Sequence, residues 1–189
     1  FFGCAKLSAI AIPSATTSVG NWAFAECTGL TTLNIPASVS TIGWRAFIGC
    51  SKLSAITVTD GSLFYSSKDG FLLSADGKTL VASPAGKQGV ATVPQGVQSI
   101  GSSAFFGCDS LSAIACPASV IRLEGWAFYG CTSLQAFDIP SNVESIETFA
   151  FGGCTQLSEV TIPSAVVSIG YQAFYSLSLI HISEPTRPE

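Results

Sequence analysis

A repeat of 23 residues is the feature that most constrains how this chain can fold. Six cysteines mark the repeat: Cys4, Cys27, Cys50, Cys108, Cys131 and Cys154. Within the first three and within the last three, neighbouring cysteines are 23 residues apart, and one period plus 35 residues separates the two groups. Prolines and Ala-Phe pairs follow the same period. The prolines are Pro13, Pro36, Pro94, Pro117, Pro140 and Pro163, and the pairs end at Phe24, Phe47, Phe105, Phe128, Phe151 and Phe174. Such self-similarity is typical of solenoids, in which each unit contacts only its neighbours.

One unit runs from residue 30 to 52 and reads LTTLNIPASVSTIGWRAFIGCSK. The alternation around Leu33 and Ile35 predicts a short strand, which Pro36 ends because proline cannot donate to a ladder. A second extended segment follows, then Gly43, which we expect to allow a sharp turn, and WRAFIGC, which we expect to form a single helical turn held by packing. The apolar residues of one unit are buried only when units stack.

Composition excludes several classes of protein. Hydrophobic residues make up 48% of the chain and charged residues 11%, which favours a large continuous core. The longest charge-free run, 160–183, contains proline, glycine and many serines, so we expect no membrane span. The net charge is −4 and the 8 basic residues are scattered, which argues against a nucleic-acid partner. No signal peptide is expected in this piece.

The pattern C-x-x-L-x-x-I-x-I-P-x-x-V-x-x-I-G-x-x-A-F-x-x-C resembles the BspA-like leucine-rich repeat, the Treponema pallidum type, from Phe1 to Tyr175. The resemblance implies an α/β leucine-rich repeat solenoid, a β-rich right-handed coil with short parallel strands, single helical turns and a β-hairpin insertion. It also implies a cell-surface or secreted protein that acts in adhesion or protein binding and is not an enzyme. Glu124 and Glu147 depart from the pattern where the turn glycine belongs. Gly125 follows Glu124, so the turn there could shift by one residue, whereas the turn geometry around Glu147 stays open.

Residues 60–92 interrupt the period. The dipeptide Asp-Gly occurs three times within this segment, and Asp-Gly between apolar runs is a strong signal for a β-hairpin. We expect a three-stranded meander bulging from the solenoid, with strands at Leu63–Ser66, Phe71–Ser74 and Thr79–Ala82. Its role is either binding, since insertions in repeat proteins often map to the binding face, or merely architectural.

No catalytic, cofactor-binding or metal-ligating residue is predicted. Thiols 23 residues apart, without a nearby histidine, have neither zinc-site spacing nor a base, so we expect free, buried thiols that act as small hydrophobes. ADGKT at 75–79 lacks the first glycine of a phosphate loop and is better explained as a hairpin turn.

Aromatic residues just before the Ala-Phe pairs are the candidate contact residues: Trp22, Trp44, Trp126, Phe149 and Tyr171. A row of half-exposed rings along one edge could stack on sugars or anchor a protein. The alternative is that these rings cover the short helical turns of adjacent coils.

The leading hypothesis is a non-enzymatic binding or adhesion module, in one domain of residues 1–175, that contacts a protein or glycan. The alternatives are a purely structural spacer or stalk, and a non-catalytic part of a larger enzyme. Residues 176–189 lie outside the repeat and end in a proline-rich stretch, so we expect a loose tail. This tail is similar to the peptide produced when sequencing-adapter DNA is translated in frame.

Overall fold

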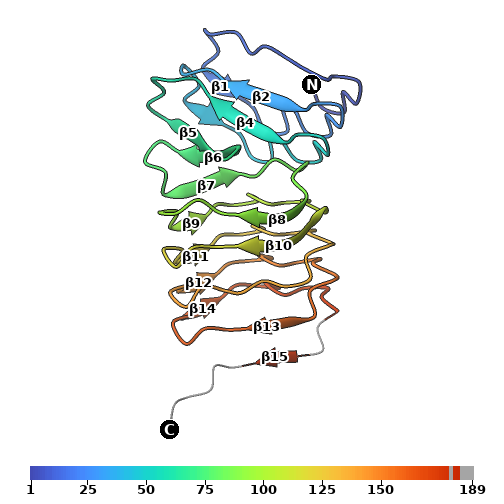
Figure 1. Cartoon of the computed structure of the whole chain (residues 1–189), viewed down its shortest axis with the longest axis vertical. Helices are drawn as coiled ribbons and strands as arrows, with labels where there is room; N and C mark the ends of the chain where they lie inside the picture. Colours follow the sequence, from blue (N-terminus) through green and yellow to red (C-terminus); the bar gives the residue numbers. More distant parts are fainter. Residues whose placement is uncertain (179–180, 184–189) are drawn as a thin grey trace.

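The computed structural model describes residues 1–178 and 181–183. They form a β-solenoid of about seven turns whose coils stack along the long axis, from the N-terminus at one end to the C-terminus at the other (Figure 1). Within these residues the regular elements are all short strands. The expected leucine-rich repeat solenoid is therefore present, with strands in the predicted parallel arrangement.

The strands lie on two faces of the solenoid. On the first face the longer strands pair in parallel: β2 (Thr32–Ile35) with β4 (Ala55–Val58), β8 (Gly89–Thr92) with β10 (Leu111–Ala115), and β13 (Glu159–Thr161) with β15 (His181–Ser183). In β2, Leu33 and Ile35 are buried while Thr32 and Asn34 are exposed. This period-2 burial is the pattern that the sequence predicted.

On the second face, β1 (Ser18–Val19) pairs with β3 (Thr41–Ile42). The remaining strands form one sheet in the order β14-β12-β11-β9-β7-β6-β5. Their bounds are β5 Tyr65–Lys68, β6 Phe71–Ser74, β7 Thr79–Ala82, β9 Ser99–Ile100, β11 Arg122–Leu123, β12 Ser145–Ile146 and β14 Ser168–Ile169. The parallel register of β9, β11, β12 and β14 pairs residues one repeat apart, such as Arg122 with Ser145.

The third side of each coil is formed by segments such as residues 20–27, for which we expected a single helical turn. That prediction is wrong. In residues 20–27, the amides of Ala25 and Cys27 donate three residues back, to the carbonyls of Trp22 and Phe24, whereas the amides of Trp22 and Phe24 donate to the next coil. Trp22 has a φ of 58°. A helix needs negative φ throughout and bonds of every amide four residues back. The amides of this segment donate alternately within their own coil and to the next coil, so the segment is a run of turns and not a helix.

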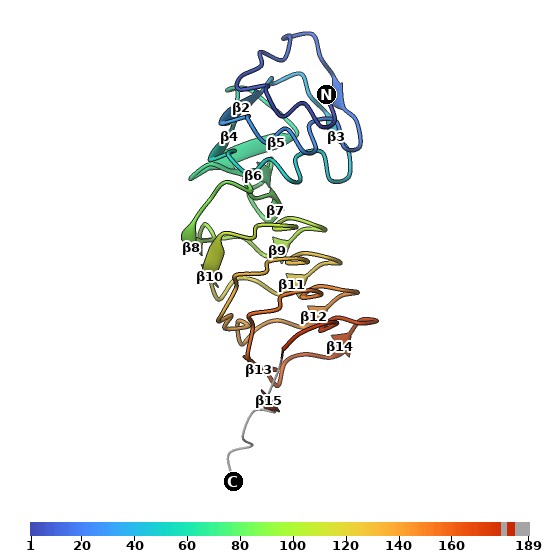
Figure 2. The same cartoon turned by 90° about the vertical axis from the view of Figure 1, so that its right-hand side faces the viewer.

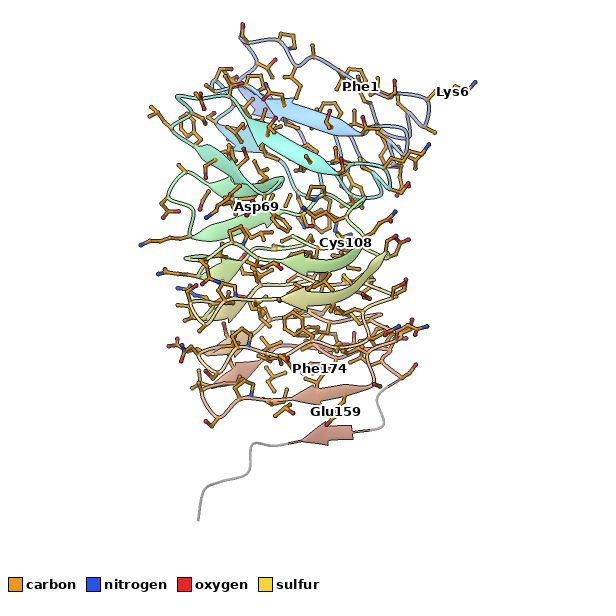
Figure 3. All side chains as sticks on the ribbon, viewed as in Figure 1. Phe1, Lys6, Asp69, Cys108, Glu159 and Phe174 are labelled. Atoms are coloured by element: carbon orange, nitrogen blue, oxygen red, sulfur yellow. The ribbon has the colours of Figure 1, made fainter. Side chains whose placement is uncertain are left out.

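The core is a stack of phenylalanines from the Ala-Phe pairs. The rings of Phe105 and Phe128 lie 5.4 Å apart, those of Phe128 and Phe151 lie 4.9 Å apart, and those of Phe151 and Phe174 lie 5.4 Å apart, all stacked within 21° of parallel. Figure 3 shows Phe174 within the stack and Lys6 pointing away from it. From Phe105 to Phe174, the coils therefore share one apolar column.

The insertion lies within the stack, between the coils of β2 to β4 and those of β8 to β14 (Figures 1 and 2). Its three strands form the predicted antiparallel meander, although β5 begins two residues later than expected. β7 then pairs in parallel with β9, which joins the meander to the repeat sheet. Leu72 packs in an N-terminal core and Leu73 and Leu80 in a C-terminal core. The meander thus connects two cores and does not bulge from one.

The two glutamates at the turn-glycine position join neighbouring coils. The carboxylate of Glu124 accepts hydrogen bonds from the Ser99 hydroxyl at 2.6 Å and the Ser102 amide at 3.0 Å. The carboxylate of Glu147 accepts one from the Gly125 amide at 3.0 Å. Neither glutamate has a positive φ. The turn is therefore kept at both positions, and each carboxylate adds a bond across the coil interface.

The strand β15 lies in the segment that we expected to be a loose tail. Because β15 pairs in parallel with β13, the expectation fails for residues 181–183. Residues 179–180 and 184–189 lie outside the described residues.

Candidate functional site: an aromatic ridge beside an interrupted ladder

The structure brings the five candidate aromatic residues together in one row. Ring centroids are 5.5 Å apart for Trp22 and Trp44 and 6.1 Å for Trp44 and Trp126. The row continues with 5.4 Å between Trp126 and Phe149 and 5.8 Å between Phe149 and Tyr171. These contacts run along the stack, and the contact between Trp44 and Trp126 passes the turn at 101–108, which has serines at the corresponding positions. We call these five residues the aromatic ridge.

The ridge residues occupy one of two neighbouring positions in the repeat, and the two positions differ in backbone conformation. Trp22, Trp126 and Phe149 themselves have φ values of 58°, 59° and 54°. Trp44 and Tyr171 instead precede the residue with positive φ in their coils. A left-handed conformation costs a residue other than glycine roughly 1–2 kcal/mol. The packing of rings from successive coils offsets that cost.

Four further aromatic residues flank the ridge, and the sequence analysis missed them. Phe2 packs on Trp22 at 6.5 Å, Tyr129 on Phe149 at 6.1 Å, and Tyr175 on Phe149 at 5.9 Å. Phe106 stacks on Tyr129 at 5.0 Å. A signal was available, since Phe106, Tyr129 and Tyr175 each follow an Ala-Phe pair directly.

The ridge is amphipathic, with its rings partly buried against each other and partly open to solvent. Tyr171 is 70% exposed and Trp44 is 43% exposed, while Trp22, Trp126 and Phe149 are half-buried. Large aromatic side chains of this exposure are enriched in protein interfaces, because they bury much area and lose little conformational entropy. The rings also pack against rings from the turns of other coils.

Arg45 provides a positive charge within the ridge. Its guanidinium carbon lies 3.9 Å from the ring centroid of Trp44, 4.0 Å from that of Phe106 and 4.8 Å from that of Trp126. Its Nε donates a long hydrogen bond of 3.5 Å to the Ser103 hydroxyl. Burial lowers the pKa of Arg45 from its ordinary value, and an arginine guanidinium stays protonated in proteins. The ridge therefore carries a cation held between aromatic faces.

Backbone hydrogen bonds connect the turns of successive coils in a regular way, which we call the turn ladder. Three alternate amides of each turn donate to three carbonyls of the next, as Ser103 to Gly125, Phe105 to Ala127 and Gly107 to Tyr129. The same triple recurs between the turns at 20–27 and 43–50, 124–131 and 147–154, and 147–154 and 170–176.

The insertion interrupts the turn ladder between the turns at 43–50 and 101–108. Among the described residues, the amides of Arg45 and Phe47 have no acceptor, and the carbonyls of Ser102 and Phe106 have no donor. Only the amide of Ser83, from the insertion, reaches across to the Ala104 carbonyl, at 2.7 Å. One level of the ladder is therefore partly unpaired.

A cleft of about 230 Å³ opens at this interruption. The turn at 43–50 forms one wall, with Trp44, Arg45 and Phe47, and the turn at 101–108 forms the other, with Ser102 and Phe106. The insertion lines it at residues 81–83 and 85. The cleft thus combines open backbone groups, a guanidinium and aromatic walls.

The thiols have no reactive surroundings. Cys27, Cys50, Cys108, Cys131 and Cys154 are free and buried, as expected, whereas Cys4 is exposed. Burial raises the pKa of Cys50 to about 11 and that of Cys108 to about 12. A thiol with so high a pKa is protonated at neutral pH and is a poor nucleophile or metal ligand. In the part of the chain that the structure describes, no group of three His, Cys, Asp or Glu residues could hold a metal ion.

The family model for the BspA type leucine rich repeat region matches residues 1–74 and 89–187, in 6 copies. The chain belongs to this family of BspA-type leucine-rich repeat proteins. Apart from residues 188 and 189, the match leaves out residues 75–88, which lie in the insertion. Comparison with curated protein sequences returns no significant match.

Solved structures of bacterial proteins resemble this BspA-type chain. The pneumococcal vaccine antigen PcpA is 26% identical, with a TM-score of 0.81 over 88% of this chain and 42% of that one. A leucine rich cell surface protein from Faecalibacterium prausnitzii is 27% identical, with a TM-score of 0.76 over 93% and 53%. A leucine-rich repeat protein from Bacteroides ovatus is 27% identical, with a TM-score of 0.59 over 95% and 43%. The chain spans about half of the length of these relatives. In residues 1–178 and 181–183, no helix could cross a bilayer.

Proposed function

We propose that this BspA-type chain is a non-enzymatic binding module of a cell-surface or secreted bacterial protein. The observation that carries the proposal is the aromatic ridge, which runs along the stack and keeps Trp44 and Tyr171 open to solvent. The names of two relatives, a vaccine antigen and a cell surface protein, support the location. The partner is a protein or a glycan, contacted through many rings on a rigid scaffold.

A row of rings suits an extended partner better than a small molecule. Successive rings of the ridge are spaced 5.4–6.1 Å apart, so contacts accumulate with the number of rings that a partner covers. Rings that already pack on one another lose little freedom when a partner covers them, which lowers the entropic cost of binding. Affinity then depends on the number of rings engaged.

Screening the chain against extracellular-matrix proteins and a glycan array tests this proposal. A captured partner should lose about 10-fold or more in affinity when Tyr171 and Trp44 are both replaced by alanine, since truncated aromatic anchors cost at least ~2 kcal/mol. Phe64→Ala is the matched control, because Phe64 is 47% exposed and lies in the insertion, away from the ridge.

The same screen distinguishes a binding module from a spacer and tests whether the ridge is the contact surface. If no protein or glycan binds, the chain is a spacer, and if binding persists in the double variant, the ridge is not the contact surface. Equal losses in the double variant and in Phe64→Ala would also contradict the proposal.

A further inference from the structure

We propose that the cleft at the interruption of the turn ladder binds a short acidic peptide segment of a partner protein, which completes the ladder and pairs its carboxylate with Arg45. The inference rests on the proposed binding function. The cleft shares Trp44 with the ridge, but it also offers open backbone groups and the Arg45 guanidinium, whereas the ridge offers ring faces.

The pattern of open backbone groups at the cleft favours a peptide ligand. In every other turn interface the amides of alternate residues donate to alternate carbonyls of the next coil. At the cleft, the amides of Arg45 and Phe47 face one side, and the carbonyls of Ser102 and Phe106 face the other. A peptide supplies carbonyls for those amides and amides for those carbonyls, as the repeat segments do in the rest of the ladder. A sugar chain has no such alternation of donors and acceptors.

The second argument is that the chain already shows this mode of pairing. Ser83 is not part of the repeat, yet its amide donates to the Ala104 carbonyl in place of a repeat residue. A segment of unrelated sequence can therefore take a position in the ladder, because backbone groups carry the bonds. The carbonyls of Ser102 and Phe106, on either side of Ala104, are open to a second such segment.

The third argument is charge. Arg45 has five N–H donors, and the described residues engage one of them, at 3.5 Å. No acidic side chain is among the groups that shift its pKa. A half-buried guanidinium held against Trp44 and Phe106 is desolvated and pre-positioned, so a carboxylate would gain a strong charge-assisted pair. An acidic residue is therefore preferred over a neutral one.

Size limits the ligand. The cleft of about 230 Å³ is smaller than the roughly 300–1,000 Å³ of sites for drug-sized ligands. It therefore suits two or three residues of a longer segment, with the remainder lying across the ridge.

Fluorescence polarisation with a labelled, terminally capped peptide Ser-Val-Glu-Val-Ser tests the proposal. The wild-type chain should bind it, with quenching of tryptophan emission from Trp44 and Trp126. The same peptide with Gln for Glu should bind about 10-fold more weakly, because bonds to charged groups are worth about 1.5–3 kcal/mol. A version with N-methylated valines should also bind more weakly, because it loses the amides that would donate to the open carbonyl of Ser102 or of Phe106.

Variants of the protein, measured with the same peptides, test the role of Arg45. Arg45→Gln should abolish the difference between the Glu and Gln peptides, and Arg45→Lys should restore part of it. Arg122→Gln, which removes an exposed cation from β11, is the matched control and should leave binding unchanged. The N-methylated peptide keeps the test valid if Arg45→Gln perturbs folding, since it uses the wild-type chain.

Several results would overturn the inference: no binding of the Glu peptide at about 1 mM, the limit of weak recognition, equal binding of the Glu and Gln peptides, or equal binding of the N-methylated peptide. Binding of an oligoglucuronate in place of the peptide would assign the cleft to acidic glycans and refute the peptide. Tyr171→Ala separates the two proposals, because it should weaken a ridge partner and leave the pentapeptide unaffected.

Discussion

At the scale of single residues, the Sγ atom of Cys50 donates to the carbonyl oxygen of Phe24 at 3.0 Å. Cys131 makes the equivalent contact to Phe105, and Cys154 to Phe128, each at 3.1 Å. The repeated cysteine is therefore a small apolar residue that also satisfies a carbonyl of the preceding coil. Alanine would fill less volume and serine would be harder to desolvate, which accounts for a thiol at this position.

Thiol titration gives a pH prediction. The ordinary thiol pKa is 9.0, and burial raises that of Cys50 to about 11 and that of Cys108 to about 12. A group whose pKa is raised by folding stabilises the fold fully below its unfolded pKa and loses that contribution as pH rises through the folded value. We expect the free energy of unfolding contributed by these thiols to be constant below pH 9.0 and to fall between pH 9.0 and about 12.

Urea unfolding at a series of pH values measures that decline. The Cys108→Ala variant should lose stability at neutral pH but decline less steeply above pH 9.0 than the wild type. Parallel curves for the two proteins would contradict the assignment. Alkylation of the folded chain at neutral pH should modify Cys4 first, since it is exposed.

A second residue-scale prediction concerns Gly43. Its φ is not positive, so the turn does not require glycine for conformational reasons. A Cβ at Gly43 would lie 2.3 Å from the Asn21 backbone nitrogen, which belongs to the preceding coil. Gly43→Ala should therefore cost about 1–3 kcal/mol or more through a backbone shift. Thermal or urea unfolding measures the cost.

Gly20 provides the control, because it holds the same repeat position and a Cβ there would meet nothing within 4 Å. Gly20→Ala should be neutral or slightly stabilising, by up to about 1 kcal/mol. Equal effects at the two positions would show that close approach between coils is not the reason for glycine.

The repeat predicted most of the buried residues, because apolar residues at fixed positions identify the inward face without knowledge of the fold. It could not predict the turn geometry of WRAFIGC. Alternate carbonyls of that segment, those of Trp44, Ala46 and Ile48, accept hydrogen bonds from the preceding coil, and the sequence within the segment looks the same for a helical turn. The aromatic row was predicted from its position, but the cation–π contacts of Arg45 with Phe106 join residues from opposite sides of the insertion.

At the scale of elements, β6 serves both cores because successive side chains of a strand point to opposite faces. Leu72 packs with the N-terminal core, whereas Phe71 and Leu73 pack with the C-terminal core. Phe71 also meets Phe105 at 6.0 Å, at the level where the phenylalanine stack of the repeats is broken. The strands of the meander could be predicted from Asp-Gly turns. Its place in the stack could not, since that depends on which faces its leucines cover.

Two leucine substitutions test this division. Leu72→Ala and Leu80→Ala should each cost about 2–5 kcal/mol, the usual cost of truncating a fully buried leucine. Leu72→Ala should raise amide hydrogen exchange mainly in β1 to β4, and Leu80→Ala mainly in β9 to β14. A uniform rise in exchange in either variant would show that the two cores unfold as one unit.

At the scale of the whole molecule, apolar side chains are exposed at both ends of the stack. Phe1 and Phe2 are 64% and 65% exposed at one end, and Val167 and Ile169 are 84% and 52% exposed at the other. The strand β14 also presents an open edge, since β12 is its one partner among the described strands. Open edges and exposed apolar residues promote association.

We therefore expect this chain to associate as its concentration rises. Replacing both Val167 and Ile169 by lysine should raise the monomer fraction several-fold in sedimentation velocity. Leu63→Lys is the control, since Leu63 is 81% exposed but lies in the insertion. If the control dissolves the assemblies equally, or the wild type stays monomeric, association through the ends is refuted.

The meander also has a consequence for how the chain reaches its structure. Near-identical coils can pair one repeat out of step, because each strand finds similar partners above and below. The meander has no copy elsewhere, and its antiparallel strands pair with residues only a few positions away, as Lys68 with Phe71. Such local pairs form quickly. Once β7 then joins β9, the coils on that side have a fixed starting point, and a shift by one repeat would break this junction. The one irregular segment of the chain thereby sets the alignment of the regular ones.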